Sequence, residues 1–279
     1  MGDFRGARMS VREALRDFRW LEYRPFLWIM VIEVLFLFFA LNLGTAWGMA
    51  GAGWLLKTIG AGALHYPASY LVLTIAQSRL EWALFTLLGS FLIPLSLVRI
   101  EAPMAGFSPT GPDSVRRARR AYLPTFIAQI LNIVLVILWQ LLLQVGPSRW
   151  IHFFVGGIIG DTLTLGVGIL IAFLISALFI YVPIRGVDSG GSIKNALLGG
   201  IQEGIRYLGP TLFIVLVFIW PTLIFLAPVQ LRPALLVTRF RPELIAILLL
   251  IATVLNSFVN YLIYSAAARL HWLGKRREG

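Results

Sequence analysis

The sequence predicts an all-α polytopic membrane protein, a bundle of about six transmembrane helices that form three hairpins, each preceded by an interfacial amphipathic helix. The first observation is composition: 58% of the 279 residues are apolar and only 13% are charged, whereas soluble domains carry about a quarter charged residues. The second is a series of apolar runs of about 20 residues, the length that a helix needs to cross a bilayer. One soluble core cannot hold this many apolar side chains, so lipid must solvate much of the surface.

Six apolar runs define the predicted spans. They fall at about 25–48, 81–100, 122–146, 163–185, 209–230 and 243–266. Segments 49–80 and 153–162 are also apolar, and they suit an interfacial, a re-entrant or a long tilted arrangement equally well. We predict a single membrane domain over 1–279, made of an amphipathic segment at 1–24, hairpins within 25–100, 101–185 and 186–266, and a basic tail at 267–279.

The distribution of Lys and Arg predicts the orientation of these spans. Eighteen of the 24 basic residues lie on one side, in the N-terminal segment, two connecting segments and the C-terminal tail, and the other six lie opposite. Because cytoplasmic segments carry the excess of Lys and Arg, both termini are expected in the cytoplasm. The net charge of +11 therefore belongs to membrane orientation, and no nucleic-acid partner is expected.

A five-residue pattern occurs three times. Its copies read Ser, a β-branched residue, a basic residue, any residue, Ala, at Ser10–Ala14, Ser114–Ala118 and Ser192–Ala196. Each copy precedes a predicted pair of spans and is followed by a proline where the chain enters the bilayer, at Pro25, Pro124 and Pro210. This placement predicts three repeated units.

Each copy also predicts the start of an interfacial helix. Serine is a favoured N-cap, and Ser10 with Glu13 matches a capping box. Nearby apolar residues then share one helical face, while basic residues lie off it, as in a helix that rests on an anionic leaflet. The alternative is a plain basic loop. The expected contacts with lipid headgroups are Arg12, Arg16, Arg19, Arg116, Arg117, Arg119, Arg120, Lys194 and Arg206.

The second half of the chain resembles a bacterial family of six-span membrane proteins. The residues that carry the resemblance are Ser192-Ile-Lys-Asn-Ala-Leu, Gly199-Gly200, Ile205-Arg206, Pro210 and the ending Tyr264-Ser-Ala-Ala-Ala-Arg269. The family includes the membrane domain attached to some glycerophosphodiester phosphodiesterases, together with uncharacterised relatives. The resemblance implies a six-span fold and carries over no catalytic residue, since the chain has no phosphodiesterase domain.

One carboxylate lies well inside a predicted span. Glu33 is about 12 Å along the first span from Pro25, at the helical rise of roughly 1.5 Å per residue. Polar residues of other spans fall at similar depth, which predicts a buried cluster of Glu33, Gln129, Asn132, Asn256 and Asn260. Such a cluster is either a proton or solute site, or a hydrogen-bonded group that stabilises helix packing.

No known catalytic pattern stands elsewhere in the chain. Cysteine is absent and three histidines are scattered, so we expect no cofactor, no metal site and no enzymatic activity. By elimination we expect a structural or accessory subunit, a scaffold of a bacterial inner-membrane assembly, whose partners are other membrane subunits and the bilayer. The alternatives are a transporter or permease for a small solute or lipid that uses the Glu33-centred cluster, and, less favoured, a lipid-modifying enzyme.

Overall fold

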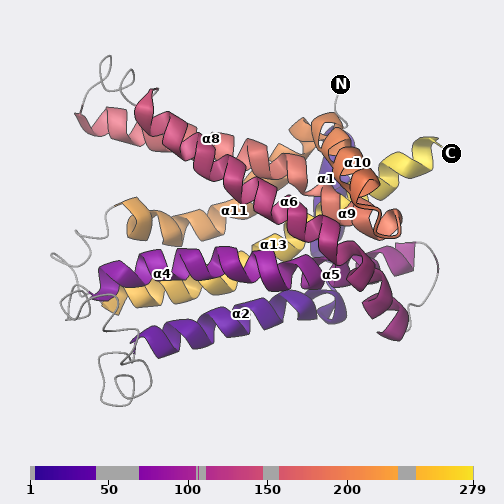
Figure 1. Ribbon diagram of the computed structural model, residues 1–279, viewed down its shortest axis with the longest axis horizontal. Coiled ribbons are helices and arrows are strands. Elements are labelled where there is room, and N and C mark those ends of the chain that lie inside the picture. Colours follow the sequence, from indigo (N-terminus) through magenta and orange to yellow (C-terminus); the bar gives the residue numbers. More distant parts are fainter. Residues whose placement is uncertain are drawn as a thin grey trace. The chain divides into compact units, whose positions relative to one another are not determined.

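The computed structural model describes residues 4–41, 69–104, 106, 111–146, 157–231 and 243–278. Within these ranges every regular element is a helix (Figure 1). The elements are α1 (Phe4–Arg16), α2 (Trp20–Leu41), α4 (Ser69–Leu84), the π-helix η2 (Phe85–Gly89), α5 (Ser90–Met104), α6 (Gly111–Val145), α8 (Gly157–Phe179), α9 (Tyr181–Asp188), α10 (Ile193–Arg206), α11 (Leu208–Leu231) and α13 (Glu243–Glu278).

The predicted all-α membrane bundle is confirmed, since six helices are long and apolar enough to cross a bilayer. They are Trp20–Leu41, Leu73–Met104, Gly111–Val145, Gly166–Asp188, Leu208–Leu226 and Glu243–Arg276. The second span is longer than expected, because its helical run begins at Ser69, before the predicted start at residue 81. Residues 157–162, whose arrangement the sequence left open, form the first turns of α8, whereas 49–68 and 153–156 lie outside the described residues.

The chain divides into two compact units. Unit 1 comprises Met1–Glu22, Ser90–Val217 and Leu262–Gly279, and unit 2 comprises Tyr23–Gly89 and Phe218–Tyr261. Helices α2, α11 and α13 each contribute residues to both units. The expectation of a single membrane domain over 1–279 stays a prediction.

In unit 1, α6 packs against α5, α8 and α9, and α10 packs against α8 and α9; Figure 1 shows α6 and α8 running side by side. Ala128, Phe179, Val182 and Ala196 form a buried cluster where α6, α8, α9 and α10 meet. Alanine at two of these positions keeps the helix backbones close, because small side chains permit short interhelical distances.

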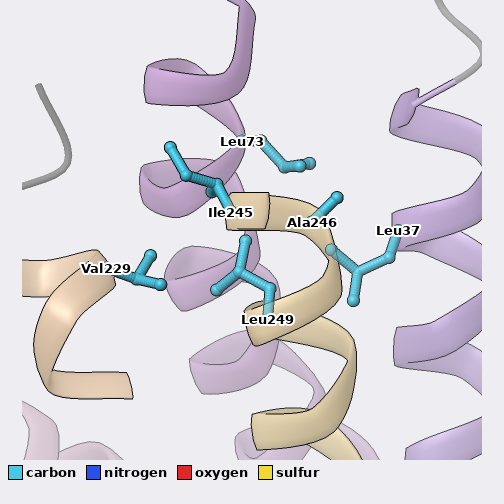
Figure 2. Close-up of a cluster of buried hydrophobic side chains, with 6 residues drawn as sticks. All are labelled: Leu37, Leu73, Val229, Ile245, Ala246 and Leu249. Carbon is cyan, nitrogen blue, oxygen red and sulfur yellow. The ribbon is translucent and has the colours of Figure 1, made fainter. Parts of the chain in front are cut away.

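In unit 2, a buried apolar cluster joins α2, α4, α11 and α13. Figure 2 shows its side chains directed toward one another; they are Leu37, Leu73, Val229, Ile245, Ala246 and Leu249. These helices are connected by long stretches of chain, so the cluster is a tertiary feature rather than a local one. The cluster holds these four helices together.

Two of the three serines of the repeated pattern are not the helix N-caps that the sequence predicted. Helix α1 begins at Phe4, so Ser10 lies inside it, and the predicted N-cap and capping box with Glu13 are wrong. Ser114 likewise lies inside α6, which runs without a break from the basic segment into the span. Only Ser192 is an N-cap, and it makes no side-chain cap hydrogen bond.

What the three copies share is a buried small residue. The final alanine of each copy, Ala14, Ala118 and Ala196, is fully buried, and Ser10 and Ser114 are buried with it. Serine and alanine four residues apart share one helical face. The pattern therefore provides a small face that packs closely against neighbouring helices of unit 1.

Candidate functional site

Glu33 lies on the buried face of α2. The buried residues Phe26, Ile29, Glu33 and Leu37 follow one another at intervals of three or four, so they form one stripe of the helix. Glu33 is only 2% exposed, and its Oε1 atom has no hydrogen-bond partner among the described residues. Glu33 therefore faces the interior of unit 2.

A second carboxylate of unit 2, Glu81 on α4, interacts electrostatically with Glu33. The side-chain amide of Asn256 on α13 donates a hydrogen bond to Oε1 of Glu81 on α4. The carboxyl groups of Glu81 and Glu33 are close enough to interact electrostatically. Helices α2, α4 and α13 therefore bring two carboxylates and an amide together inside membrane-spanning segments.

The sequence analysis missed Glu81, because it placed the residue at the very end of a span predicted to begin at 81. The long helix from Ser69 onward places Glu81 in its interior instead. One signal was available: Gln77 precedes Glu81 by four residues, so two polar side chains share one face of an otherwise apolar helix.

Gln77 makes a parallel contact one turn away. Its Nε2 atom donates to Oγ1 of Thr253 over 3.3 Å, and Thr253 precedes Asn256 on α13 by about one turn. Gln77 is 5% exposed, and its Oε1 atom has no hydrogen-bond partner among the described residues. Two successive polar pairs thus join α4 to α13. We name Glu33, Gln77, Glu81, Thr253 and Asn256 the unit 2 polar core.

The π-helix η2 begins four residues after Glu81. It spans Phe85–Gly89, and the hydroxyl of Thr86 donates to the carbonyl oxygen of Trp82 over 2.7 Å. Single turns of π-helix inside α-helices are rare and occur frequently at functional sites. The irregular turn therefore supports a functional interpretation of the unit 2 polar core.

Two members of the predicted polar cluster have partners in unit 1. Gln129 forms a side-chain hydrogen bond with Tyr264, and Oδ1 of Asn132 accepts a hydrogen bond of 3.3 Å from the hydroxyl of Ser176. Asn260 is half-buried on α13. The contacts found within each unit do not test whether all five predicted residues meet, so the complete cluster stays a prediction.

Unit 1 contains a separate set of paired charges around His271. Nε2 of this imidazole lies 3.0 Å from Oδ2 of Asp188 and Nδ1 lies 2.9 Å from Oε2 of Glu203. Lys275 extends the set, with Nζ 3.3 Å from Oδ2 of Asp188, and Arg185 pairs with Glu203. His271 is 3% exposed. We name these five residues the His271 network; it ties together α9, α10 and α13.

A buried arginine of α13, Arg269, holds α1. Nη1 of Arg269 lies 3.1 Å from Oδ2 of Asp17 and 3.8 Å from Oε2 of Glu13. From sequence, the end of this helix was expected to be a basic tail (267–279), and neither set of ion pairs was predicted. Charged residues at the polar end of a span look alike in sequence whether or not another helix covers them.

The residues predicted to contact lipid headgroups all belong to unit 1 and are all exposed. They are Arg12, Arg16, Arg19, Arg116, Arg117, Arg119, Arg120, Lys194 and Arg206. Exposed apolar side chains such as Leu15, Trp20 and Ile205 lie near them. Such a mixture suits the boundary between headgroups and acyl chains, and the headgroup contacts themselves stay a prediction.

Comparison with known protein families, curated proteins and solved structures finds no match. Within the described part of the chain, no group of three His, Asp or Glu side chains is arranged to hold a metal ion. The fold therefore defines the class, an all-α integral membrane protein with six candidate spans. Its particular function is argued from the unit 2 polar core.

Proposed function

We propose that the chain is a permease for a small solute or lipid that is coupled to a proton or another small cation. The observation that carries the proposal is the pair of interacting carboxylates, Glu33 and Glu81, on neighbouring membrane helices. Ionisable residues are costly in a membrane interior and are retained where they mark ion or substrate paths. The π-helix that follows Glu81 supplies a local irregularity of the kind that transport sites use.

The proposal reverses the preference that sequence alone supported. A single intramembrane carboxylate is readily explained as a hydrogen-bonded packing element, and on that ground an accessory subunit was the better expectation. Two adjacent carboxylates repel each other when both are ionised, so they stabilise packing poorly unless a proton or cation lies between them. This arrangement favours transport over a purely structural role.

Cation flux into proteoliposomes tests the proposal. We expect wild-type protein to take up protons or ²²Na⁺ under an imposed membrane potential faster than empty liposomes do. Glu33→Gln and Glu81→Gln should each slow this uptake by about tenfold or more. Loss of a hydrogen bond to a charged group costs roughly 1.5–3 kcal/mol, and 1.4 kcal/mol corresponds to a tenfold change in an equilibrium constant. A pH-sensitive dye and filter-trapped radioactivity report the two ions.

Glu243→Gln is the matched control, because this carboxylate is exposed at the start of α13 and lies outside the unit 2 polar core. It should leave the flux at the wild-type level. Uptake no faster than in empty liposomes, or equal uptake by wild type and both core variants, would contradict the permease proposal.

The second candidate is the non-enzymatic structural or accessory subunit expected from the sequence. The observation that favours it is the face of α6, where large apolar side chains between Leu123 and Val145 are exposed. Mild detergent extraction followed by mass spectrometry tests it. A stoichiometric membrane partner that is lost when Leu131, Leu135 and Leu138 are replaced by alanine would support the subunit, and inactive proteoliposomes would strengthen that result.

The proposed location is a bacterial inner membrane, with both termini in the cytoplasm and anionic headgroups around the exposed arginines of unit 1. We also propose that the chain belongs with the six-span family that its second half resembles, and that it has no enzymatic activity. These proposals rest on the sequence patterns described above.

Cysteine labelling checks the orientation cleanly, because the chain has no native cysteine. Ser192→Cys places a thiol at an exposed position before α10, and we expect it to react with an impermeant maleimide only after cells are opened. Lys57→Cys, on the opposite predicted side, should react in intact cells. The reverse labelling pattern would show that the orientation is inverted.

A further inference from the structure

The unit 2 polar core presents more hydrogen-bond acceptors than donors. The Nε2 group of Gln77 is directed to Thr253 and the Nδ2 group of Asn256 to Glu81, which leaves both amide oxygens as acceptors. Oε1 of Gln77 and Oε1 of Glu33 are buried and have no partner among the described residues. Ionised carboxylates are acceptors only. Because the core has more oxygen acceptors than hydrogen-bond donors, a cation can bind to the oxygen atoms that lack a donor.

The distribution of charge in unit 2 also indicates a cation site. The described part of unit 2 contains two basic residues, Arg24 and Arg79, and both are exposed. The guanidinium carbon of Arg79 stands 4.9 Å from the centre of the Trp82 ring. Neither arginine forms a salt bridge with Glu33 or Glu81, and the charged group that interacts with Glu33 is Glu81. Within the described part of unit 2, therefore, no basic side chain balances the two carboxylates.

We propose that the unit 2 polar core binds one monovalent metal cation, Na⁺ in the first instance, between Glu33 and Glu81. Carboxylate, amide and hydroxyl oxygens are hard ligands, which suit hard cations such as Na⁺. A monovalent ion is favoured over Ca²⁺ or Mg²⁺ because the cost of dehydration rises steeply with charge, and the site lies within membrane-spanning segments. One Na⁺ and one proton together neutralise the two carboxylates.

This proposal rests on the proposed function and names its coupling ion as a metal cation.

The cation site is tested by equilibrium binding rather than by flux. Purified full-length protein in detergent is unfolded by heat at constant ionic strength, with NaCl replaced stepwise by choline chloride, and tryptophan fluorescence reports the midpoint. A ligand that binds only the folded state raises that midpoint by about 2–4 °C for each tenfold rise in its concentration above Kd.

We expect the unfolding midpoint of wild type and of Glu243→Gln to rise with Na⁺ concentration. The midpoints of Glu33→Gln and Glu81→Gln should not rise. If the core variants do not fold, ²²Na⁺ binding to wild-type protein in a scintillation proximity assay, competed by unlabelled Na⁺ but not by choline, supplies the same evidence. Equal shifts in all four proteins, a response to Ca²⁺ or Mg²⁺ alone, or no saturable ²²Na⁺ binding would overturn the site.

The two assays separate the two proposals. Proton flux that depends on Glu33 without any Na⁺ binding would overturn the metal site and leave the permease standing. Saturable Na⁺ binding by a protein that moves neither ion across liposomes would leave the site standing and overturn the permease. If the protein neither transports an ion nor binds Na⁺, the unit 2 polar core stabilises helix packing only.

Discussion

Replacing His271 by leucine is expected to destabilise the folded protein by about 3–5 kcal/mol, the usual cost of removing one partner from a buried ion pair. The imidazole stands between Asp188 and Glu203, each within 3.0 Å of one ring nitrogen. Its loss leaves two carboxylates, 12% and 10% exposed, without the group that separates them. Thermal unfolding in mild detergent, followed by tryptophan fluorescence, measures the effect.

The double variant His271→Leu/Asp188→Asn distinguishes lost charge balance from lost packing. Removing one of the two facing carboxylates should restore part of the stability, because neighbouring residues in one network are coupled rather than additive. Lys275→Met is the mild control, since its side chain is 53% exposed and exposed pairs are worth about 0–1 kcal/mol. An unfolding midpoint for His271→Leu equal to that of wild type would show that the His271 network contributes no stability.

Replacing Gly200 or Gly204 by alanine is expected to cost about 1–3 kcal/mol each, and more when both are changed, because α10 touches its neighbours through backbone atoms there. A Cβ atom on Gly200 would lie 2.6 Å from Cα of Val182, and one on Gly204 would lie 2.8 Å from Cα of Leu178. Neither neighbour is a flexible side chain that is free to move aside. The spacing Gly-x-x-x-Gly is that of closely crossing membrane helices.

Gly199 provides a matched control one residue away. A Cβ atom there meets only the side chain of Arg185, at 3.7 Å or more, so Gly199→Ala should fit without strain. Alanine is a better helix former than glycine by roughly 0.8–1.0 kcal/mol. We therefore expect Gly199→Ala to raise the unfolding midpoint while Gly200→Ala lowers it, and equal midpoints would contradict the close crossing.

The six spans were predictable because the requirement for them is local. A helix must present about 20 apolar residues to the bilayer, whatever its neighbours are, and the predicted runs match the observed helices in number. Helix starts were less predictable. The segment that ends at residue 81 mixes Gln77, Arg79 and Glu81 with apolar residues. These polar residues made it look unlike a span, although it belongs to the same long helical run.

The threefold pattern was found in sequence but its role was misjudged at Ser10 and Ser114. Serine favours both helix starts and close helix contacts, and the choice depends on what lies opposite. In the structure both serines are buried within helices. Neighbouring helices therefore decided between two roles that the five residues themselves allow equally.

By itself, the sequence determined that this chain is an all-α multi-pass membrane protein and that Glu33 lies inside a span. Those conclusions follow from hydropathy and length, which are properties of contiguous segments. Only the tertiary structure paired Glu33 with Glu81, joined Glu81 to Asn256, and placed His271 between Asp188 and Glu203. Each of these contacts depends on how helices distant in the chain rotate and align against one another, and no local pattern of residues encodes that register.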